Sequence, residues 1–153
     1  MSSEFDELEE FVIAEMRKVY SEKVLDHFWN PRNLGHIPDA DGFGRITGPC
    51  GDTMEIFLRV AGDKVVDTAF YTDGCGATIA CGSMATELVK GKSIAEALSI
   101  TSDEILNSLG GLPEEHLHCS VLAANALRAA VRDYQACKRE PWKKTYRRRQ
   151  TLA

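Results

Sequence analysis

Two alternating runs joined by a four-residue turn constrain the fold more than any other stretch of the chain. Residues 53–60 carry apolar side chains at every second position, on one side of an extended strand (Met54, Ile56, Leu58 and Val60). The opposite side carries Glu55 and Arg59, with Phe57 as an exception. Residues 61–64 read Ala-Gly-Asp-Lys, a hairpin turn, and residues 65–72 return as a second strand. The sequence therefore predicts a small antiparallel sheet, to which residues 42–47 add a short first strand.

Segments with helical periodicity precede and follow the strands of this predicted sheet. Before it, residues 4–19 repeat apolar residues at helical intervals (Phe5, Leu8, Val12, Met16 and Val19). This amphipathic helix continues or restarts through residues 20–28, and Pro31 ends it. After the sheet, a helix is predicted from about Ala77 to Lys90, with Gly91 as its stop. Two short helices then follow the capping boxes Ser93-x-x-Glu96 and Thr101-x-x-Glu104.

A long helix closes the folded part of the chain. It runs to about Cys137 and begins either at Pro113 or nearer Cys119. Its predicted core-facing stripe consists of Leu117, Val121, Ala124, Leu127, Val131 and Tyr134. The fold class is therefore α+β, a small three-stranded antiparallel sheet packed by several helices, with an added N-terminal helix over residues 1–19. Residues 1–137 are predicted to form one domain and residues 138–153 a basic C-terminal tail.

Charge and hydropathy exclude several classes of protein. The net charge is −5, yet residues 138–149 hold seven basic residues against Glu140, so the body is strongly acidic. Nucleic-acid binding is not expected, because its positive charge would spread over a folded face; the tail is interpreted as solvated or partly disordered, with partner docking as the alternative. No apolar run approaches the roughly 18–20 residues of a membrane span. The acidic N-terminus lacks the features of a secretion signal, so a cytoplasmic, reducing location is expected.

In a reducing compartment the five cysteines are better interpreted as metal ligands or reactive thiols than as disulfides. Cys50 lies in a loop between strands, Cys75 lies between glycines where a strand gives way to a helix, and Cys119 lies at or near the start of the long helix. Helix N-termini lower thiol pKa values, so these three are candidates for one site. Cys81 is predicted to point away from this site because of its position on the helix, and Cys137 is predicted to lie too far along its helix to reach it. Both are therefore interpreted as packing or surface residues.

Two further residues carry possible metal ligands. Cys50 and Asp52 point to the same side of an extended segment, and Gly51 between them lets a bound object approach the backbone. A soft sulfur beside a hard oxygen is an odd pairing for tight binding alone, and it makes better sense if the bound species must leave. His118 precedes Cys119, but neighbours on a helix diverge by about 100°, so both bind one ion only if the helix start is irregular.

The other three histidines, His27, His36 and His116, are interpreted as surface or packing residues. Three thiols with Asp52 and His118 suit either a zinc ion or an iron–sulfur cluster. A long-lived electron-transfer centre more commonly has four cysteines. Three thiolates and one weaker ligand therefore suggest a cluster that is held provisionally.

The sequence resembles the IscU family of iron–sulfur cluster assembly scaffolds, which includes the N-terminal domain of NifU. The resemblance covers about residues 20–135 and depends on several separate motifs in order. They are Tyr20-Ser21-Glu22-Lys23-Val24, Asn30-Pro31-Arg32-Asn33, Cys50-Gly51-Asp52, Gly74-Cys75-Gly76, Val89-Lys90-Gly91-Lys92-Ser93 and His118-Cys119-Ser120.

The resemblance implies a scaffold, not an enzyme, on which a cysteine desulfurase deposits persulfide sulfur and iron is added. The resulting labile 2Fe–2S cluster passes to recipient apoproteins. Cys50, Cys75 and Cys119 match the cluster ligands, Asp52 the residue that keeps the cluster labile and His118 the alternative fourth ligand. Cys119 also matches the persulfide-accepting thiol. The same resemblance implies zinc in the apo form, frataxin-like and ferredoxin partners, and a homodimer in some states, across which two clusters could fuse to 4Fe–4S.

Two departures from the family qualify what it implies. Members served by a DnaK-type chaperone carry Leu-Pro-Pro-Val-Lys before the His-Cys pair, but residues 112–116 read Leu-Pro-Glu-Glu-His, which weakens the case for chaperone-driven release. The N-terminal helix and the basic tail also exceed the minimal scaffold.

The alternative function is a zinc-dependent sulfur relay like the SufU relatives, which typically carry an insertion between the second and third cysteines and lack the histidine. Here 44 residues separate Cys75 from Cys119 without an evident insertion, and His118 is present.

Overall fold

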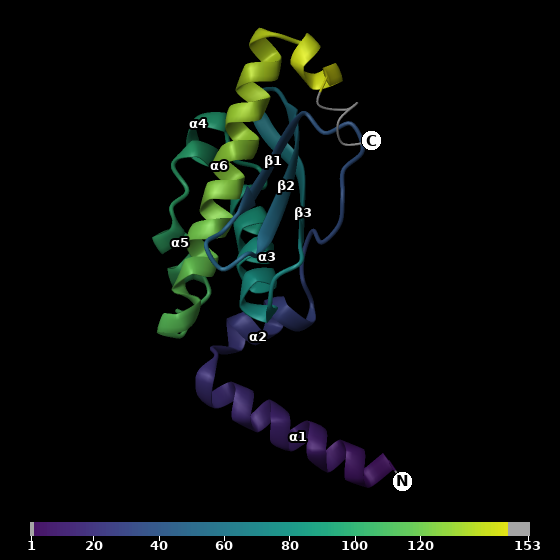
Figure 1. Ribbon diagram of the computed structural model, residues 1–153, viewed down its shortest axis with the longest axis vertical. Coiled ribbons are helices and arrows are strands. Elements are labelled where there is room, and N and C mark those ends of the chain that lie inside the picture. Colours follow the sequence, from purple (N-terminus) through teal and green to yellow (C-terminus); the bar gives the residue numbers. More distant parts are fainter. Residues whose placement is uncertain (1, 147–153) are drawn as a thin grey trace.

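The predicted hairpin is present in the computed structural model, which describes residues 2–146. Strands β1 (Gly42–Thr47), β2 (Thr53–Ala61) and β3 (Lys64–Thr72) form one antiparallel sheet in the order β1-β2-β3 (Figure 1). The β2–β3 turn places Gly62 at φ 59° and Asp63 at φ 62°. Positive φ at both central residues is the geometry that suits the twist of a two-residue hairpin. The sheet and its turn are therefore confirmed.

The two faces of the sheet have different roles. Met54, Ile56 and Leu58 are fully buried in the main core, where α3 (Gly76–Val89) and α6 (Leu117–Arg139) cover the sheet (Figure 1). Phe57, the exception in the alternation, is buried on the opposite face in a smaller cluster with Ile37, Ala40 and Ala69. The segment after α2 supplies two of these residues, and its Leu34 pairs with Phe70 of β3. Phe57 is thus apolar because both faces of β2 are covered.

The remaining helices agree with the predicted α+β class. They are α1 (Ser2–Val19), α2 (Glu22–Trp29), α4 (Ile94–Leu98) and α5 (Ser102–Ser108). The Ser93–Glu96 capping box is complete, with both reciprocal hydrogen bonds. At α5 the Thr101 hydroxyl accepts a hydrogen bond from the Glu104 backbone, which is half of the predicted box. These caps fix where the short helices begin and hold them against α6.

The predicted core stripe of α6 is wrong at its first two positions. Leu117 and Val121 are 38% and 47% exposed, whereas Ala124, Leu127 and Val131 are buried as predicted. The buried face runs instead through Cys119, Leu122, Ala123, Ala126 and Ala130. Two glycines of β1 determine which face of α6 turns toward the sheet. A Cβ on Gly42 or Gly44 would lie 2.5 Å from a carbonyl oxygen of α6, so strand and helix backbones are in close contact there. Close backbone contact therefore turns the small residues of α6 toward the sheet.

Replacing Gly44 with alanine tests this contact. The new methyl group would lie 2.5 Å from the Ala126 carbonyl oxygen and 2.6 Å from the Ala130 nitrogen. Neither backbone atom can move without shifting α6, so we expect a loss of about 1–3 kcal/mol in the free energy of unfolding, measured by urea denaturation. Gly48→Ala is the matched control, since its nearest neighbours lie at 3.7 Å or more. Equal stability of the two variants would contradict the close packing of α6 on β1.

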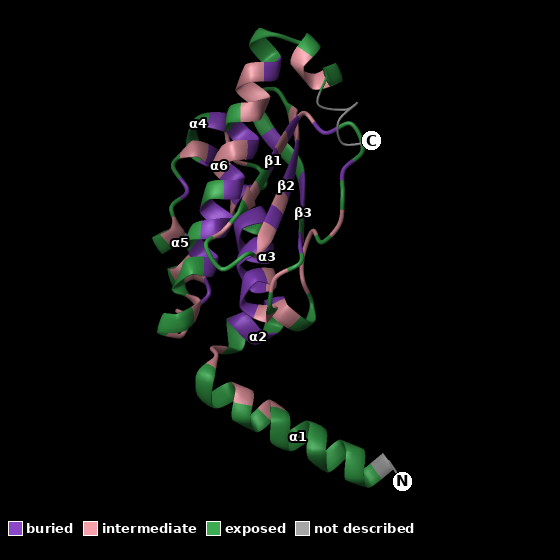
Figure 2. Cartoon of the chain, in the orientation of Figure 1, coloured by how far each residue is buried: buried purple, intermediate pink, exposed green. Residues whose placement is uncertain are grey.

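Helix α1 projects from the body, and most of its residues are exposed (Figures 1 and 2). The amphipathic helix is present, but its apolar side is open to solvent, with Phe5 76% and Leu8 59% exposed. Its last turn meets the body, where Met16 lines a pocket with α2, and residues from Phe5 to Met16 line a second groove together with Trp29 of α2. Within residues 2–146, no helix combines the length and the apolar character that crossing a bilayer requires.

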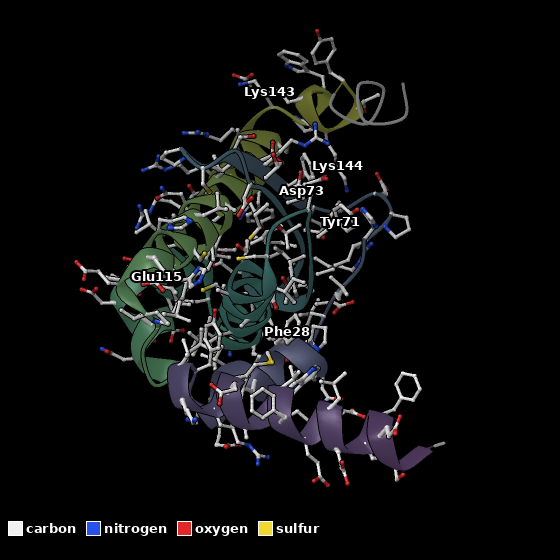
Figure 3. All side chains as sticks on the ribbon, turned by 60° about the horizontal axis from the view of Figure 1, so that its bottom comes forward. Phe28, Tyr71, Asp73, Glu115, Lys143 and Lys144 are labelled. Atoms are coloured by element: carbon white, nitrogen blue, oxygen red, sulfur yellow. The ribbon has the colours of Figure 1, made fainter. Side chains whose placement is uncertain are left out.

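The first part of the basic tail is ordered. Residues 142–146 form a further helical turn after α6, and Figure 3 shows Lys143 and Lys144 on it. The Lys144 ammonium lies 3.1 Å from a carboxylate oxygen of Asp41. Lys144 therefore joins this turn to the body, while Trp142 and Tyr146 stay exposed; Arg147, Arg148 and Arg149 lie outside the described residues.

Candidate metal centre

A tight loop between β1 and β2 positions the first pair of predicted ligands. The Gly48 N–H donates to the Asp52 carbonyl at 2.8 Å, the Gly51 N–H donates to the Gly48 carbonyl at 3.0 Å, and Gly51 has φ 90°. This geometry exposes Cys50 and turns Asp52 toward the β3–α3 junction. Cys50, Asp52 and His118 each place a ligand atom within 4.8 Å of the others. The structure thus brings together three of the five predicted site residues in one donor set.

The other two predicted ligands form a second donor set with a histidine that was interpreted as a surface or packing residue. Ligand atoms of Cys75, His116 and Cys119 lie within 4.8 Å of one another. His116 is half-buried, and one of its ring nitrogens, Nε2, lies 3.2 Å from the Tyr20 hydroxyl. His116 therefore packs on Tyr20, within the predicted interpretation, but its ring also lies beside both thiols. The His-x-His-Cys pattern of residues 116–119 was the available signal, but its value depended on the shape of the helix start.

An irregular turn precedes α6. The 3₁₀ turn η1 (Glu114–His116) ends at the junction, where His116 has φ −113° and ψ 5°, outside the helical region. His118 and Cys119 themselves lie within α6, so this turn does not change the angle between them, and they belong to different donor sets. Their side chains nevertheless approach each other, with His118 Nε2 3.7 Å from the Cys119 sulfur, and Figure 3 labels Glu115 of η1.

The Thr78 hydroxyl connects the two donor sets. Its Oγ1 lies 3.3 Å from Asp52 Oδ2, 3.3 Å from the Cys119 sulfur and 3.5 Å from the Cys75 sulfur. Thr78 is fully buried one helical turn after Cys75, so its side chain lies on the same face of α3. Sequence reasoning missed this residue, although its spacing from Cys75 was a signal. The Thr78 hydroxyl therefore contacts one member of the first donor set and two of the second.

The thiols of the second set have opposite acidities. At Cys75, the N-cap of α3, burial raises the pKa, but hydrogen bonds from the Thr78 hydroxyl and from backbone N–H groups outweigh it and hold the pKa below its ordinary value. Burial raises the pKa of Cys119 to about 11, against the hydrogen bond from Thr78 that lowers it. The expectation that a helix N-terminus lowers the pKa is thus wrong for Cys119, because its desolvation is the larger effect.

The remaining cysteines and histidines lie outside these donor sets. Cys81 is fully buried in the core, and burial raises its pKa. Cys137 is buried near the end of α6, with its sulfur 3.8 Å from Asp133 Oδ1. His27 Nδ1 lies 2.7 Å from the Ser83 hydroxyl, and His36 stacks on Tyr71, which Figure 3 labels. The interpretation of these four as packing or surface residues agrees with these contacts.

Gly74 provides a test of how the site holds Asp52. A Cβ at this position would lie 2.9 Å from Asp52 Oδ2 and 2.8 Å from the Thr78 hydroxyl. We expect Gly74→Ala to push the carboxylate out of the site and to lower metal affinity by about 10- to 100-fold, the effect of disturbing a supporting group. Zinc competition with a chromophoric chelator measures this affinity, with Gly48→Ala as the control. Unchanged zinc affinity would show that metal binding does not depend on the present position of the Asp52 carboxylate.

The sheet, the helices and the thiol-rich centre define a small α+β protein with a candidate metal centre. The family model described as "NifU-like N terminal domain" matches residues 19–141. A protein of Archaeoglobus fulgidus named "Iron-sulfur cluster assembly scaffold protein IscU 1" is 56% identical over 117 residues, which are 76% of either chain. The Escherichia coli protein named "Iron-sulfur cluster assembly scaffold protein IscU" is 45% identical over 126 residues, 79% of this chain and 97% of its own length. The chain therefore belongs to the NifU-like N-terminal family, together with these IscU proteins.

The fold agrees with a solved member of the family. The crystal structure of a nitrogen-fixing NifU-like protein (N-terminal) from Brucella abortus superimposes with a TM-score of 0.60 at 18% identity. The match covers 79% of this chain and 97% of that one. At this level of identity the comparison concerns the fold alone, which is the α+β arrangement described above.

Proposed function

We propose that this protein is a scaffold on which a labile 2Fe–2S cluster is assembled from iron and desulfurase-derived sulfur, and from which it passes to apoproteins. The observation that carries the proposal is the pair of donor sets around Thr78, which offers three thiols, two histidines and one carboxylate. The names of the IscU relatives support the same role. The cluster is cargo rather than a resident cofactor, so the chain acts as a carrier and not as an enzyme.

Cys50, Cys75 and Cys119 are the proposed thiolate ligands. Cys75 is exposed and has a lowered pKa, so its thiolate is available to an arriving iron ion. Cys119 is buried with a raised pKa and is therefore protonated at neutral pH. Metal binding deprotonates a coordinating thiol. Cys119 would therefore give up its proton as it binds iron.

Asp52 and His118 supply the weaker coordination. Both belong to the donor set of Cys50, so either can complete the ligands of the iron that Cys50 holds. A carboxylate oxygen is a harder ligand than a thiolate and exchanges more readily at a thiophilic iron centre. Asp52 in this role keeps the cluster transferable, and His118 is the alternative fourth ligand.

The proposed role defines the partners. A sulfur donor and cluster recipients are required, and we propose a cysteine desulfurase as the donor, with frataxin-like and ferredoxin partners that assist. Zinc would occupy the site in the apo form, because three thiolates with one oxygen or nitrogen ligand suit it. Two 2Fe–2S clusters could fuse to 4Fe–4S across a homodimer, with the two electrons that this reductive coupling requires supplied by the ferredoxin partner. The proposed location is the cytoplasm, and residues 1–137 are the proposed scaffold domain.

Anaerobic reconstitution with iron, sulfide and thiol tests the proposal against the zinc-dependent sulfur relay. We expect a 2Fe–2S absorption spectrum with close to one cluster per chain, because the proposed ligands lie in two donor sets that Thr78 connects. A sulfur relay would retain zinc and would not form the cluster under the same conditions. Tightly bound zinc without any cluster would therefore contradict the scaffold and favour the relay.

A further inference from the structure

We propose that His116 is a metal ligand, and that with Cys75 and Cys119 it forms a binding site for one divalent ion, such as Fe²⁺ or Zn²⁺, before the cluster is built. This inference extends the proposed function, because the two cysteines also serve as proposed cluster ligands. The three ligand atoms lie within 4.8 Å of one another. They come from two separate elements, since Cys75 caps α3 and the other two residues flank the start of α6.

The surroundings of the His116 ring indicate which nitrogen binds the ion. Nε2 lies 3.2 Å from the Tyr20 hydroxyl, whereas Nδ1 is buried and has no hydrogen-bond partner. A buried nitrogen without a partner is costly, so such an atom needs an explanation. If Nε2–H donates to Tyr20, Nδ1 carries the free lone pair that a metal ligand requires. A histidine ligand commonly donates its other ring N–H to an oxygen in this way.

The chemistry of the donor set selects the class of metal. Two sulfurs and one imidazole nitrogen suit borderline-soft divalent ions, and they leave one position open in a tetrahedral site. With metal–ligand bond lengths of about 2.0–2.3 Å, the ligand atoms would lie roughly 1 Å closer together than the 4.8 Å within which they now lie. Side-chain rotation at the start of α6 and at exposed Cys75 can supply this contraction.

A pocket beside these ligands provides access for the fourth ligand. Its volume is about 180 Å³, and Cys75 and His116 line it together with Tyr20 and Phe28. Figure 3 labels Phe28 on α2, next to the end of α1. Water or sulfide can therefore reach the open coordination position from this side. The site lies next to the donor set of Cys50, Asp52 and His118 but shares no ligand with it.

Cobalt titration under anaerobic conditions tests the inference in a chain that carries Cys50→Ser, which removes the only thiol of the other donor set. We expect the intense visible bands of tetrahedral Co²⁺ with two thiolates. Adding His116→Ala should weaken Co²⁺ binding by more than roughly 100-fold, because losing a ligand costs more affinity than losing a group that supports a ligand. Tyr20→Phe, which removes only the supporting hydroxyl, should weaken it by about 10- to 100-fold. His36→Ala is the control, since exposed His36 lies in neither donor set.

A second measurement needs no variant. Nitrogen-15 spectra of the zinc-loaded wild-type chain should show His116 bound through Nδ1 and protonated at Nε2. Wild-type Co²⁺ affinity in the His116→Ala chain, or a His116 ring without bound metal, would overturn the inference. Cluster reconstitution in the same chains separates the two ideas. A cluster that forms while His116 binds no ion leaves the proposed function standing, whereas Co²⁺ binding without any cluster in the wild type contradicts the function alone.

Discussion

Replacing Cys75 with serine is expected to abolish formation of the 2Fe–2S cluster. Cys75 is the exposed thiol at the N-cap of α3, and hydrogen bonds hold its pKa below the ordinary value. Serine preserves the size of the side chain but offers no thiolate to iron. Even disturbing a supporting group lowers metal affinity about 10- to 100-fold, so the loss of this ligand should cost more. The measurement is cluster absorbance per chain after anaerobic reconstitution.

Cys81→Ser is the matched control, because it makes the same substitution on the same helix. Cys81 is fully buried in the core and lies in neither donor set. A buried hydroxyl without a partner costs about 1–3 kcal/mol, so the melting temperature should fall while the cluster yield stays at the wild-type value. A folded Cys81→Ser chain that fails to form a cluster would contradict the assignment of the ligands. Cluster formation by Cys75→Ser would contradict it as well.

Replacing Asp52 with alanine is expected to lengthen the lifetime of the cluster. Asp52 lies beside Cys50 and His118, and its carboxylate is held within 3.3 Å of the Thr78 hydroxyl. Its removal eliminates the hard ligand through which the iron exchanges or admits water, and leaves His118 as the fourth ligand. A tenfold longer lifetime corresponds to a barrier higher by about 1.4 kcal/mol. The decay of cluster absorbance in the presence of a chelator measures it.

Asp73→Ala controls for the loss of a nearby carboxylate. Asp73 accepts a hydrogen bond from the Thr53 backbone at 2.8 Å and belongs to neither donor set. Figure 3 labels this residue. Its replacement removes the same charge without removing a ligand, so the cluster lifetime should not change. An unchanged or shorter lifetime in Asp52→Ala would show that Asp52 does not promote release.

The parts of the structure that the sequence predicted depend on local rules. Alternation over residues 53–60 and the Gly62-Asp63 turn gave the hairpin, because both signals act within a few residues. The spacing of Cys50 and Asp52 likewise predicted that they share a side, and one donor set holds both.

The features that were missed depend on contacts between distant segments. The register of α6 follows from the close approach of its backbone to Gly44, which no pattern within α6 reveals. His116 joins the site because a 3₁₀ turn precedes α6 and Tyr20, 96 residues earlier, contacts its ring. The raised pKa of Cys119 likewise follows from burial, which opposes the effect of the helix start.

Transfer of the cluster to an acceptor tests the central claim most directly. The scaffold, carrying a reconstituted 2Fe–2S cluster, is mixed anaerobically with an apoferredoxin, and circular dichroism follows the cluster as it moves. The donor set that combines the Cys50 thiol with the Asp52 carboxylate predicts complete transfer by the wild-type chain and slower transfer by Asp52→Ala. A cluster that stays on the wild-type chain while the apoferredoxin remains competent to accept one from iron and sulfide would contradict the claim.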